Sequence, residues 1–370
     1  MMPTETTSSL TFFDLTPAEL EAQLAEWGEA RYRAGQVFSW VYRKGVGAFA
    51  EMTNLPEDLR ERWAEHFSLD LPEVAERVGD QEVEKFSFRL SDGCIIESVC
   101  IHSTEGRTFC LSMQVGCDLS CRFCASGQMA FRRNLSAGEI VEQVLALERE
   151  FGRPSNLVYM GMGEPFLNYD ATMKSLSILQ EPEGYAFGAR RITVSTAGIV
   201  PEIYRFAREA GQVNLAISLH ATTDAKRQAL MPVARVYTLR QLLDAAWDYT
   251  RVTGRRVSFE YVLIRGVNDS HHDADRLIEM LGGKLAHLNI ICFNTIPRAP
   301  FKRPARKELE RFVEYLRKGG LNVTVRRSVG VRSAAACGQL AGKEELSLIH
   351  ISEPTRPYYL VCRLLLEKKK

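Results

Sequence analysis

The repeated alternation of apolar and amphipathic segments after Thr108 constrains the fold of this chain most strongly. Six short apolar runs occur here, namely TFCLSMQVG, NLVYMGMG, RITVSTAG, VNLAISLHA, VSFEYVLI and LNIICFNTI. Segments with helical periodicity, such as SAGEIVEQVLALEREF and LRQLLDAAWDYTRVTG, lie between them. This order predicts an α/β fold in which helices join parallel strands.

The ends of the predicted strands distinguish between two α/β architectures. Most of these runs end in polar or glycine-containing motifs, which suits a partial (βα)6 barrel with its chemistry at the carboxyl ends of the strands. A doubly wound open sheet is the alternative, but no predicted strand is followed by the GxGxxG sequence of its nucleotide-binding form. We therefore predict the partial barrel.

The region before Thr108 has a different pattern. Residues 14–70 show helical periodicity, and Thr16 followed by Pro17 predicts the first cap. From Val74 to His102, two alternating runs flank Ser91-Asp92-Gly93, which predicts a hairpin. We expect a small helical accessory domain over residues 1–72, and a short β-hairpin linker followed by the barrel over residues 73–345.

Composition excludes several classes of protein. The chain has 370 residues, of which 45% are hydrophobic and 25% are charged, and this composition is ordinary for a globular protein. No segment approaches the roughly 18 apolar residues of a membrane span, and the N-terminus lacks the pattern of a secretory signal. We therefore expect a cytoplasmic protein whose nine cysteines are thiols or metal ligands.

The last 25 residues, 346–370, have an unusual origin in our interpretation. The stretches LSLIHISEPTR and YLVCRLLLEKKK can be written back into codons that resemble a transposase-based sequencing adapter. The alternative is a real, slightly hydrophobic extension. We interpret residues 346–370 as read-through of an adapter and leave them, with Cys362, out of the functional argument.

Basic residues form local groups although the formal net charge is only +1. Such groups are suited to phosphate contacts, but most are ordinary solvated faces. The groups are Arg31/Arg33, Arg43/Lys44, Arg132/Arg133, Arg190/Arg191, Lys302/Arg303/Arg306 and Arg326/Arg327.

Three cysteines with C-x3-C-x2-C spacing follow the first predicted strand. Cys117, Cys121 and Cys124 stand in GCDLSCRFCASG. Three thiolates on one loop can hold three irons of a [4Fe–4S] cluster and leave the fourth iron open. A structural zinc site is the alternative, but it needs a fourth ligand, usually from a second paired motif, and neither His102 nor His220 belongs to one.

This triad, with Phe123 before its last cysteine, resembles the radical S-adenosylmethionine (SAM) superfamily. More specifically, the chain resembles the 23S rRNA adenine-C2 methyltransferases of the dual-specificity type from about residue 20 to Gly342. The motifs that carry the resemblance are RAGQVFSWVY, EMTNLPEDLR, MQVGCDLSCRFCASG, RRNLSAGEIVEQV, MGMGEPFLN, VSTAGIVP, ISLHA, GVNDS and AACGQLAG.

The resemblance implies a set of cofactors and partners. It implies one [4Fe–4S] cluster per chain and two SAM molecules per turnover. The implied partners are 23S rRNA, with tRNA as a further substrate, and an electron donor such as flavodoxin or ferredoxin. It also implies a monomer without a membrane partner.

The resemblance assigns the SAM contacts to residues at the ends of predicted strands. A glycine there allows close approach of the backbone, and a carboxylate can bind an ammonium or a hydroxyl group. A lone serine or histidine at such a position is alternatively an ordinary structural group. The implied contacts are Gly163, Glu164, Ser195, Ser218, Leu219, His220 and Asn294.

Two further cysteines acquire roles by resemblance. Cys337, in a loop of small residues, is the implied methyl-carrying thiol, and Cys110 is its resolving partner through a transient disulfide. A thiolate can take a methyl group from SAM by displacement, which the electron-poor C2 of adenine cannot do. Glu97 matches a carboxylate near the proton-transfer step, with a surface acid at a strand edge as the alternative.

The remaining cysteines and two departures complete the comparison. We expect Cys100 and Cys292 to be core residues and give Cys94 no role. The family's GxDIxAAC reads GVRSAAAC here, with Arg332 at the usual aspartate, and Val-Ala-Arg replaces the usual Ile-Asn-Lys after Pro232. Two rival hypotheses stay open: a C8-adenine rRNA methyltransferase of the antibiotic-resistance type, and a non-catalytic zinc-stabilised RNA-binding protein.

Overall fold

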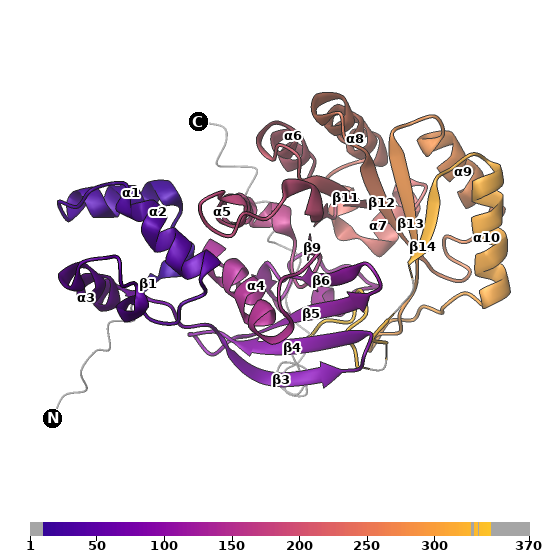
Figure 1. Cartoon of the computed structure of the whole chain (residues 1–370). Coiled ribbons are helices and arrows are strands. Elements are labelled where there is room, and N and C mark those ends of the chain that lie inside the picture. Colours follow the sequence, from indigo (N-terminus) through magenta and orange to yellow (C-terminus); the bar gives the residue numbers. More distant parts are fainter. Residues whose placement is uncertain (1–9, 327–328, 332, 342–370) are drawn as a thin grey trace, which may run out of the picture.

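The computed structural model describes residues 10–326, 329–331 and 333–341. Arg327, Arg332 and residues 346–370 with Cys362 lie outside the described residues, so the hypotheses about them stay predictions. Within the described part, a ten-stranded sheet has the order β14-β13-β12-β11-β10-β9-β6-β5-β4-β3 (Figure 1).

One part of this sheet is parallel and contains the six predicted strands. Each pair of neighbours in the order β6-β9-β10-β11-β12-β13-β14 is parallel. The strand bounds are β6 Gly106–Cys110, β9 Asn156–Tyr159, β10 Ile192–Thr196, β11 Asn214–Ser218, β12 Val257–Leu263, β13 Ala286–Cys292 and β14 Val323–Arg326. Strand β14 adds one strand to the prediction. The end of the first predicted run forms a separate strand β7 (Gln114–Val115), which pairs with β8 (Arg133–Asn134).

Amphipathic helices connect these strands. Figure 1 shows α8, α9 and α10 lying outside the last three strands of the sheet. Local sequence sets their ends: Ser136 and Glu139 form a capping box at the start of α4, and α8 ends at Gly254 with a φ of 65°. The helices are α4 Ala137–Phe151, α5 Tyr169–Gln180, α6 Val200–Glu209, α7 Asp224–Leu230, α8 Leu239–Thr253, α9 His271–Leu281 and α10 Arg306–Lys318. Short turns of 3-10 helix are η4 Ser126–Gln128, η5 Pro165–Leu167, η6 Ala189–Arg191 and η7 Pro232–Arg235.

The predicted hairpin is present, but it is not a separate linker. Strands β4 (Val83–Arg89) and β5 (Ile95–Ser103) pair on either side of the turn at Ser91–Gly93. Strand β3 (Glu73–Gly79) adds to β4, while β6 pairs antiparallel with β5 and parallel with β9. Because β6 takes part in both patterns, the hairpin continues the sheet of the strand–helix units instead of standing apart from it.

The N-terminal part consists of short helices around an aromatic core. Thr16 caps α1 with Glu19, and Pro17 is its first residue, which confirms the predicted cap. The buried rings of Phe12, Phe49 and Trp63 pack within 6.2 Å of one another. The elements are β1 Leu10–Thr11, η1 Phe12–Asp14, α1 Pro17–Glu26, α2 Arg33–Phe38, η2 Ser39–Arg43, η3 Phe49–Glu51, α3 Glu57–His66 and β2 Phe67–Ser68.

These N-terminal elements contact the sheet domain through α4. The Asp14 carboxylate accepts a hydrogen bond from Gly138 N at 2.8 Å, and Thr11 Oγ1 donates to Glu142 at 2.6 Å. A Cβ at Gly138 would come within 2.9 Å of Asp14 N and closer still to Thr11, so only glycine allows this approach. The contact orients the N-terminal helices relative to the sheet.

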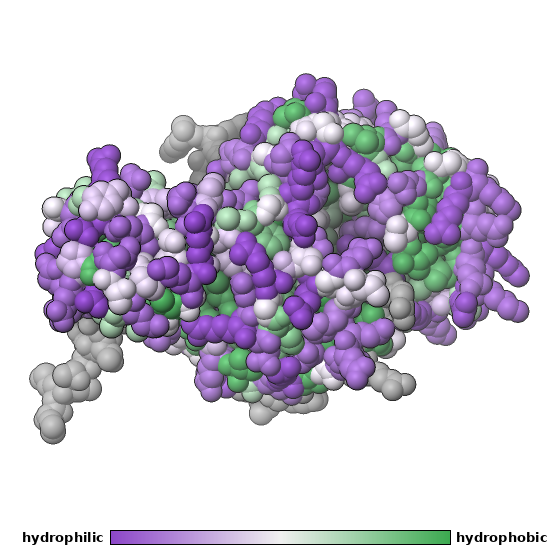
Figure 2. Space-filling model, in the orientation of Figure 1, coloured by the Kyte–Doolittle hydropathy of each residue, from purple (hydrophilic) through white to green (hydrophobic). Residues whose placement is uncertain are grey.

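Hydrophilic residues predominate on the face that Figure 2 shows, and hydrophobic residues are confined to small patches. Among the described helices, none is long and apolar enough to cross a membrane.

Candidate active site

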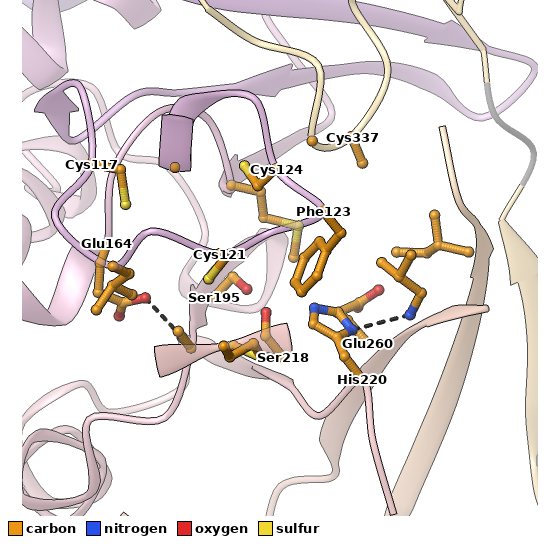
Figure 3. Close-up of a pocket in the computed structure, with 18 of the residues that line it drawn as sticks. Cys117, Cys121, Phe123, Cys124, Glu164, Ser195, Ser218, His220, Glu260 and Cys337 are labelled. Carbon is orange, nitrogen blue, oxygen red and sulfur yellow. Dashed lines mark hydrogen bonds between the residues drawn. The ribbon is translucent and has the colours of Figure 1, made fainter. Parts of the chain in front are cut away.

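A cavity at the carboxyl ends of the parallel strands collects most of the residues that the sequence singled out. It encloses about 970 Å³, including the space at its mouth. Its lining combines the cysteine loop after β7 with residues that follow β9, β10, β11 and β13 (Figure 3). Among them are Cys117, Cys121, Cys124, Gly163, Glu164, Ser195, Ser218, His220, Asn294 and Cys337.

The loop that carries the three cysteines is held by close backbone contacts. Gly116 has a φ of 76°, and a Cβ there would lie 2.1 Å from Ala130 O. Glycine at 116 is therefore required by both conformation and space. Further along the loop, Arg122 N donates to Leu230 O at 3.0 Å, which ties the loop to the end of α7.

The three cysteine side chains surround one space next to Glu164 (Figure 3). Among the described residues, no three His, Cys, Asp or Glu side chains are placed so that they could hold one metal ion between them. A cluster places each thiolate on a different iron, whereas zinc draws its ligands to about 2.3 Å from one point. Burial raises the pKa of Cys117 to about 12 and that of Cys121 further, so both are neutral thiols until a metal replaces the proton. The donor set fits the cluster.

Glu164 is buried and bound to backbone groups of the neighbouring strand end. Its Oε2 accepts from Ala197 N at 2.7 Å and its Oε1 from Phe166 N at 3.1 Å. Burial raises the pKa of this carboxyl to about 7, although these hydrogen bonds oppose the rise. The residue thus braces the turns after β9 and β10 and leaves its remaining lone pairs for a ligand.

His220 has an uncommon backbone conformation at the end of β11. Its φ is 55°, in the left-handed region that few side chains adopt. Its Nδ1 accepts a hydrogen bond from Val262 N at 3.0 Å. The His220 ring is T-shaped against the Phe123 ring, with 4.6 Å between the two ring centroids (Figure 3). Burial lowers the pKa of His220 to about 3, so the ring is neutral at physiological pH.

The GVNDS motif explains how that conformation is held. Asn268 is fully buried, and its Nδ2 donates to His220 O at 2.8 Å and to Val262 O at 2.7 Å. Its Oδ1 accepts from Ile264 N at 2.7 Å. This asparagine fastens the ends of β11 and β12 together.

Leu219 is the one predicted SAM contact whose side chain does not line the cavity. It is fully buried, its N–H donates to Glu260 O, and its carbonyl accepts from Arg227. Successive side chains of a strand point in opposite directions, so Leu219, directly after β11, packs on the face opposite to Ser218, which lines the cavity.

Cys337 lies where this cavity meets a second chamber, which Cys110 lines. The side chain of Cys337 is exposed, whereas Cys110 is buried at the end of β6. Burial raises the pKa of Cys110 to about 12. All eight described cysteines are free thiols, so the implied disulfide is not a feature of this state.

The loop that carries Cys337 is attached to the cysteine loop. Ala125 N donates to Gly338 O at 2.7 Å, and Ser126 Oγ donates to Leu340 O at 2.6 Å. Asn294 Nδ2 donates to Cys337 O at 3.1 Å. These hydrogen bonds fix the Cys337 loop against the cysteine loop and against Asn294.

Glu97 is not a surface acid and does not line either chamber. It is fully buried, its Oε1 pairs with Lys85 Nζ at 2.8 Å, and its Oε2 accepts from Ala341 N at 2.7 Å. Burial raises the pKa of Glu97, opposed by the Lys85 charge. In this structure the carboxylate anchors the end of the Cys337 loop.

The other cysteines agree with their expected places, with one addition. Cys100 and Cys292 are buried, but Cys292 also borders the cavity. Cys94 is half-buried beside the hairpin turn.

The sequence analysis gave no role in this cavity to two charged residues that line it, Glu260 and Arg326. Glu260 Oε1 accepts from Asn289 Nδ2 at 2.8 Å, while its buried Oε2 has no hydrogen-bond partner and lies 3.9 Å from Arg326 Nε. Arg326 lines both chambers, and the Glu260 carboxylate and the two cysteine sulfurs raise its pKa against burial. A single acid inside the apolar run VSFEYVLI was the signal for Glu260.

Two family models match the chain. Residues 10–69 match the ribosomal RNA large subunit methyltransferase N-terminal domain, and residues 111–281 match the Radical SAM superfamily. A dual-specificity RNA methyltransferase RlmN of Dictyoglomus turgidum is 43% identical over 326 residues, covering 87% of this chain and 94% of the relative. The RlmN of Pelotomaculum thermopropionicum is 47% identical over 334 residues, with 89% and 91% covered. The chain belongs to the RlmN family of RNA methyltransferases.

A solved structure agrees with this membership. A radical SAM methyltransferase from Sphaerobacter thermophilus is 49% identical, with a TM-score of 0.85 over 90% of this chain and 99% of that one. The chain is therefore a radical SAM enzyme of the RlmN family with a mixed α/β sheet, and the superfamily implies a [4Fe–4S] cluster and SAM. These findings support the methyltransferase over the zinc-stabilised RNA-binding protein.

Proposed function

We propose that this chain transfers a methyl group to C2 of an adenine in 23S rRNA, with tRNA as a second substrate. The observation that carries the proposal is the position of Cys337, which opens both to the cavity of the cluster cysteines and to the chamber of Cys110. A thiol that reaches both spaces can receive a methyl group from one side and deliver it on the other.

The proposed chemistry divides the transfer between two thiols. The Cys337 thiolate takes the methyl group from one SAM by displacement, because sulfur is nucleophilic where C2 of adenine is not. A second SAM is consumed in the radical step, for which the bound [4Fe–4S] cluster supplies an electron. The carbon on Cys337 Sγ would lose one hydrogen atom in that step and form a bond to C2 of the base, which loses its proton. Cys110 would then attack Cys337 Sγ, so that a disulfide forms while the bond from sulfur to that carbon breaks. The carbon would take up a proton to become the new methyl group, and the remaining unpaired electron would return to the oxidised cluster.

We propose that Cys117, Cys121 and Cys124 hold the cluster and that the strand-end residues hold SAM. Six of the seven proposed SAM contacts line one cavity with the three cysteines, which supports the assignment. Leu219 belongs to the set through the ISLHA motif alone. The SAM set is Gly163, Glu164, Ser195, Ser218, Leu219, His220 and Asn294.

We also propose that Glu97 is a catalytic residue near the proton-transfer step. Its contacts with Lys85 and Ala341 support a positioning role for the Cys337 loop in addition.

The finer partners and architecture are part of the same proposal. The parallel half of the sheet serves as a partial barrel, and a one-electron donor such as flavodoxin or ferredoxin reduces the enzyme, which acts as a monomer. The N-terminal helices serve as an RNA-docking module, with Arg31, Arg33, Arg43 and Lys44 as its phosphate contacts.

The deciding experiment identifies the modified nucleoside. The full chain and a version truncated after Glu345 are reconstituted anaerobically, incubated with SAM, reductant and an rRNA fragment, and the digested nucleosides are analysed by mass spectrometry. We expect 2-methyladenosine that disappears in Cys337→Ala and persists in Cys94→Ala. Formation of 8-methyladenosine would assign the C8 reaction, and SAM cleavage without any methylated base would mean that the substrate is wrong.

A further inference from the structure

Arg227 is a fully buried cation on α7, behind the cavity that holds the cysteines. Its side chain has no solvent exposure. Arginine is almost never buried completely unless an anion pairs with it, because removing its charge from water is costly. The residue therefore requires an explanation that its helix does not supply.

The contacts of Arg227 are with neutral carbonyl groups. Its Nε donates to Leu219 O at 3.2 Å, and its Nη2 donates to Ala197 O at 2.5 Å and to Ser218 O at 3.1 Å. These carbonyls belong to the ends of β10 and β11, which line the cavity. Arg227 thus fixes the backbone at two strand ends.

The positive charge itself has no full counter-ion among the described residues. No described carboxylate lies within ion-pair distance of Arg227, and its buried Nη1 has no hydrogen-bond partner. Asp224 is the nearest acid on the same helix, but its Oδ1 accepts from Leu239 N at 2.6 Å. Burial lowers the pKa of Arg227 to about 10, which still leaves it charged at neutral pH.

The strand ends that Arg227 binds share a cavity with the cysteine loop. Ala197 and Ser218, whose carbonyl groups accept from Arg227, line the same cavity as Cys121. Burial raises the pKa of the Cys121 thiol, and the charge of Arg227 opposes that rise. Backbone contacts join the two elements, because Arg122 N donates to Leu230 O at 3.0 Å at the end of α7. The guanidinium thus lies behind strand ends that face the cavity of Cys121.

We infer that Arg227 is the fixed counter-charge of the iron–sulfur cluster and that it raises the reduction potential of that cluster. Bound thiolates bring net negative charge into the cavity, and one-electron reduction adds more. A cation buried behind the wall of this cavity stabilises the more negative, reduced state, because net charge and local charges set cluster potentials. This inference rests on the proposed cluster; Arg227 is a positioning residue that touches no substrate.

The test is a potentiometric titration of the reconstituted full chain, followed by electron paramagnetic resonance without RNA. Three variants are compared: Arg227→Met, which removes the charge but keeps the length, Arg227→Lys, which keeps the charge, and Arg235→Met. Arg235 is an exposed cation in η7, so its loss controls for net charge. We expect Arg227→Met to lower the ratio of reduced to oxidised cluster about tenfold at a fixed potential, which is about 59 mV for one electron.

The two other variants should keep the potential of the unmodified chain. A wild-type potential in Arg227→Met, or an equally lowered potential in Arg227→Lys, would overturn the inference. If Arg227→Met assembles no cluster, iron and sulfide content decide: assembly in Arg227→Lys supports the role of the charge, and failure of both variants indicates a purely structural residue and overturns it. Absence of a cluster from the unmodified chain would instead overturn the proposed function.

Discussion

Gly163 illustrates how little space the end of β9 leaves for a side chain. Its φ is 91°, and a Cβ there would lie 2.5 Å from Gln114 Cβ. Gln114 Oε1 accepts from Glu164 N at 2.9 Å, so the added atom would also disturb the position of Glu164. We expect Gly163→Ala to weaken SAM binding tenfold or more, which is about 1.4 kcal/mol.

The matched control for this change is Gly211→Ala. Gly211 has a φ of 58° but nothing within 4 Å of the added Cβ, so it carries the conformational cost without the steric one. Binding of SAM to the reconstituted chain, measured by calorimetry, should weaken only in Gly163→Ala. Equal affinities in the two variants would contradict the close-approach argument.

Lys85 and Glu97 form a buried ion pair, and the stability of the fold depends on both partners being present. Their side chains are 3% and 0% exposed. Removing one partner leaves an uncompensated charge, so Lys85→Met should lower the free energy of unfolding by about 3–5 kcal/mol. The double variant Lys85→Met/Glu97→Gln should recover part of the loss, since no isolated charge remains.

Thermal unfolding of the chain without metal measures both effects. Lys318→Met removes one partner of an exposed pair with Glu314 and should leave the unfolding midpoint almost unchanged. A double variant less stable than Lys85→Met alone would contradict the prediction, because it would show that the unpaired charge of Glu97 does not cause the loss of stability.

The structure brings together most of the residues that the resemblance singled out, because their motifs stand at or near strand ends. Six of the seven proposed SAM contacts line one cavity. The resemblance named Glu97, but local sequence does not predict its contacts with Lys85 and Ala341. Arg227 looks like a surface charge in the short polar helix DAKRQAL. Only the packing of distant strands makes both residues fully buried.

At the scale of elements, periodicity predicted the order of strands and helices but not where the parallel part of the sheet begins and ends. All six apolar runs contain strands of the parallel part. Strand β14 was missed, because Val323–Arg326 is short and alternates with polar residues at the edge of the sheet. The union of hairpin and parallel strands was also missed, since strand pairing across β6 is a long-range property that local patterns do not encode.

The contact between η1 and α4 leads us to predict that the stability of the folded chain depends on pH. Glu142 is 8% exposed, accepts from Thr11 at 2.6 Å, and has Asp14, Glu139 and Asp70 as acidic neighbours. Burial raises its pKa from 4.5 to about 7 in the folded chain. The folded state then binds more protons than the unfolded state, so stability falls as the pH rises from about 4.5 to 7, by at most about 1.4 kcal/mol per unit.

Unfolding midpoints at pH 5 and pH 7.5 test this sign. The loss on raising the pH should be smaller in Glu142→Gln, which cannot ionise, and unchanged in Glu21→Gln, an exposed acid on α1. A Glu142→Gln variant with the pH dependence of the unmodified chain would exclude this residue as its source.

For the whole molecule, the N-terminal helices form a distinct end, well separated from α9 and α10 (Figure 1). Their four proposed phosphate contacts differ in how firmly they are held. Arg33 pairs with Glu29 at 2.9 Å, Lys44 lies 3.2 Å from the centre of the Trp40 ring, and Arg43 donates to Pro182 O. Arg31 is exposed. Side chains that are already oriented lose less entropy on meeting a phosphate.

Reversal of all four charges to glutamate should reduce RNA affinity and its dependence on salt together. Each phosphate contact contributes about 0.7 to the slope of log K against log[salt] for single-stranded RNA, so four contacts account for roughly 3. The same change in net charge at Arg306, Lys307, Arg311 and Lys318 of α10 should leave the slope intact. Binding of an rRNA fragment at several salt concentrations measures the slope. If the α10 variant lost as much slope as the N-terminal one, the effect would be general charge and the docking role of the helices would be refuted.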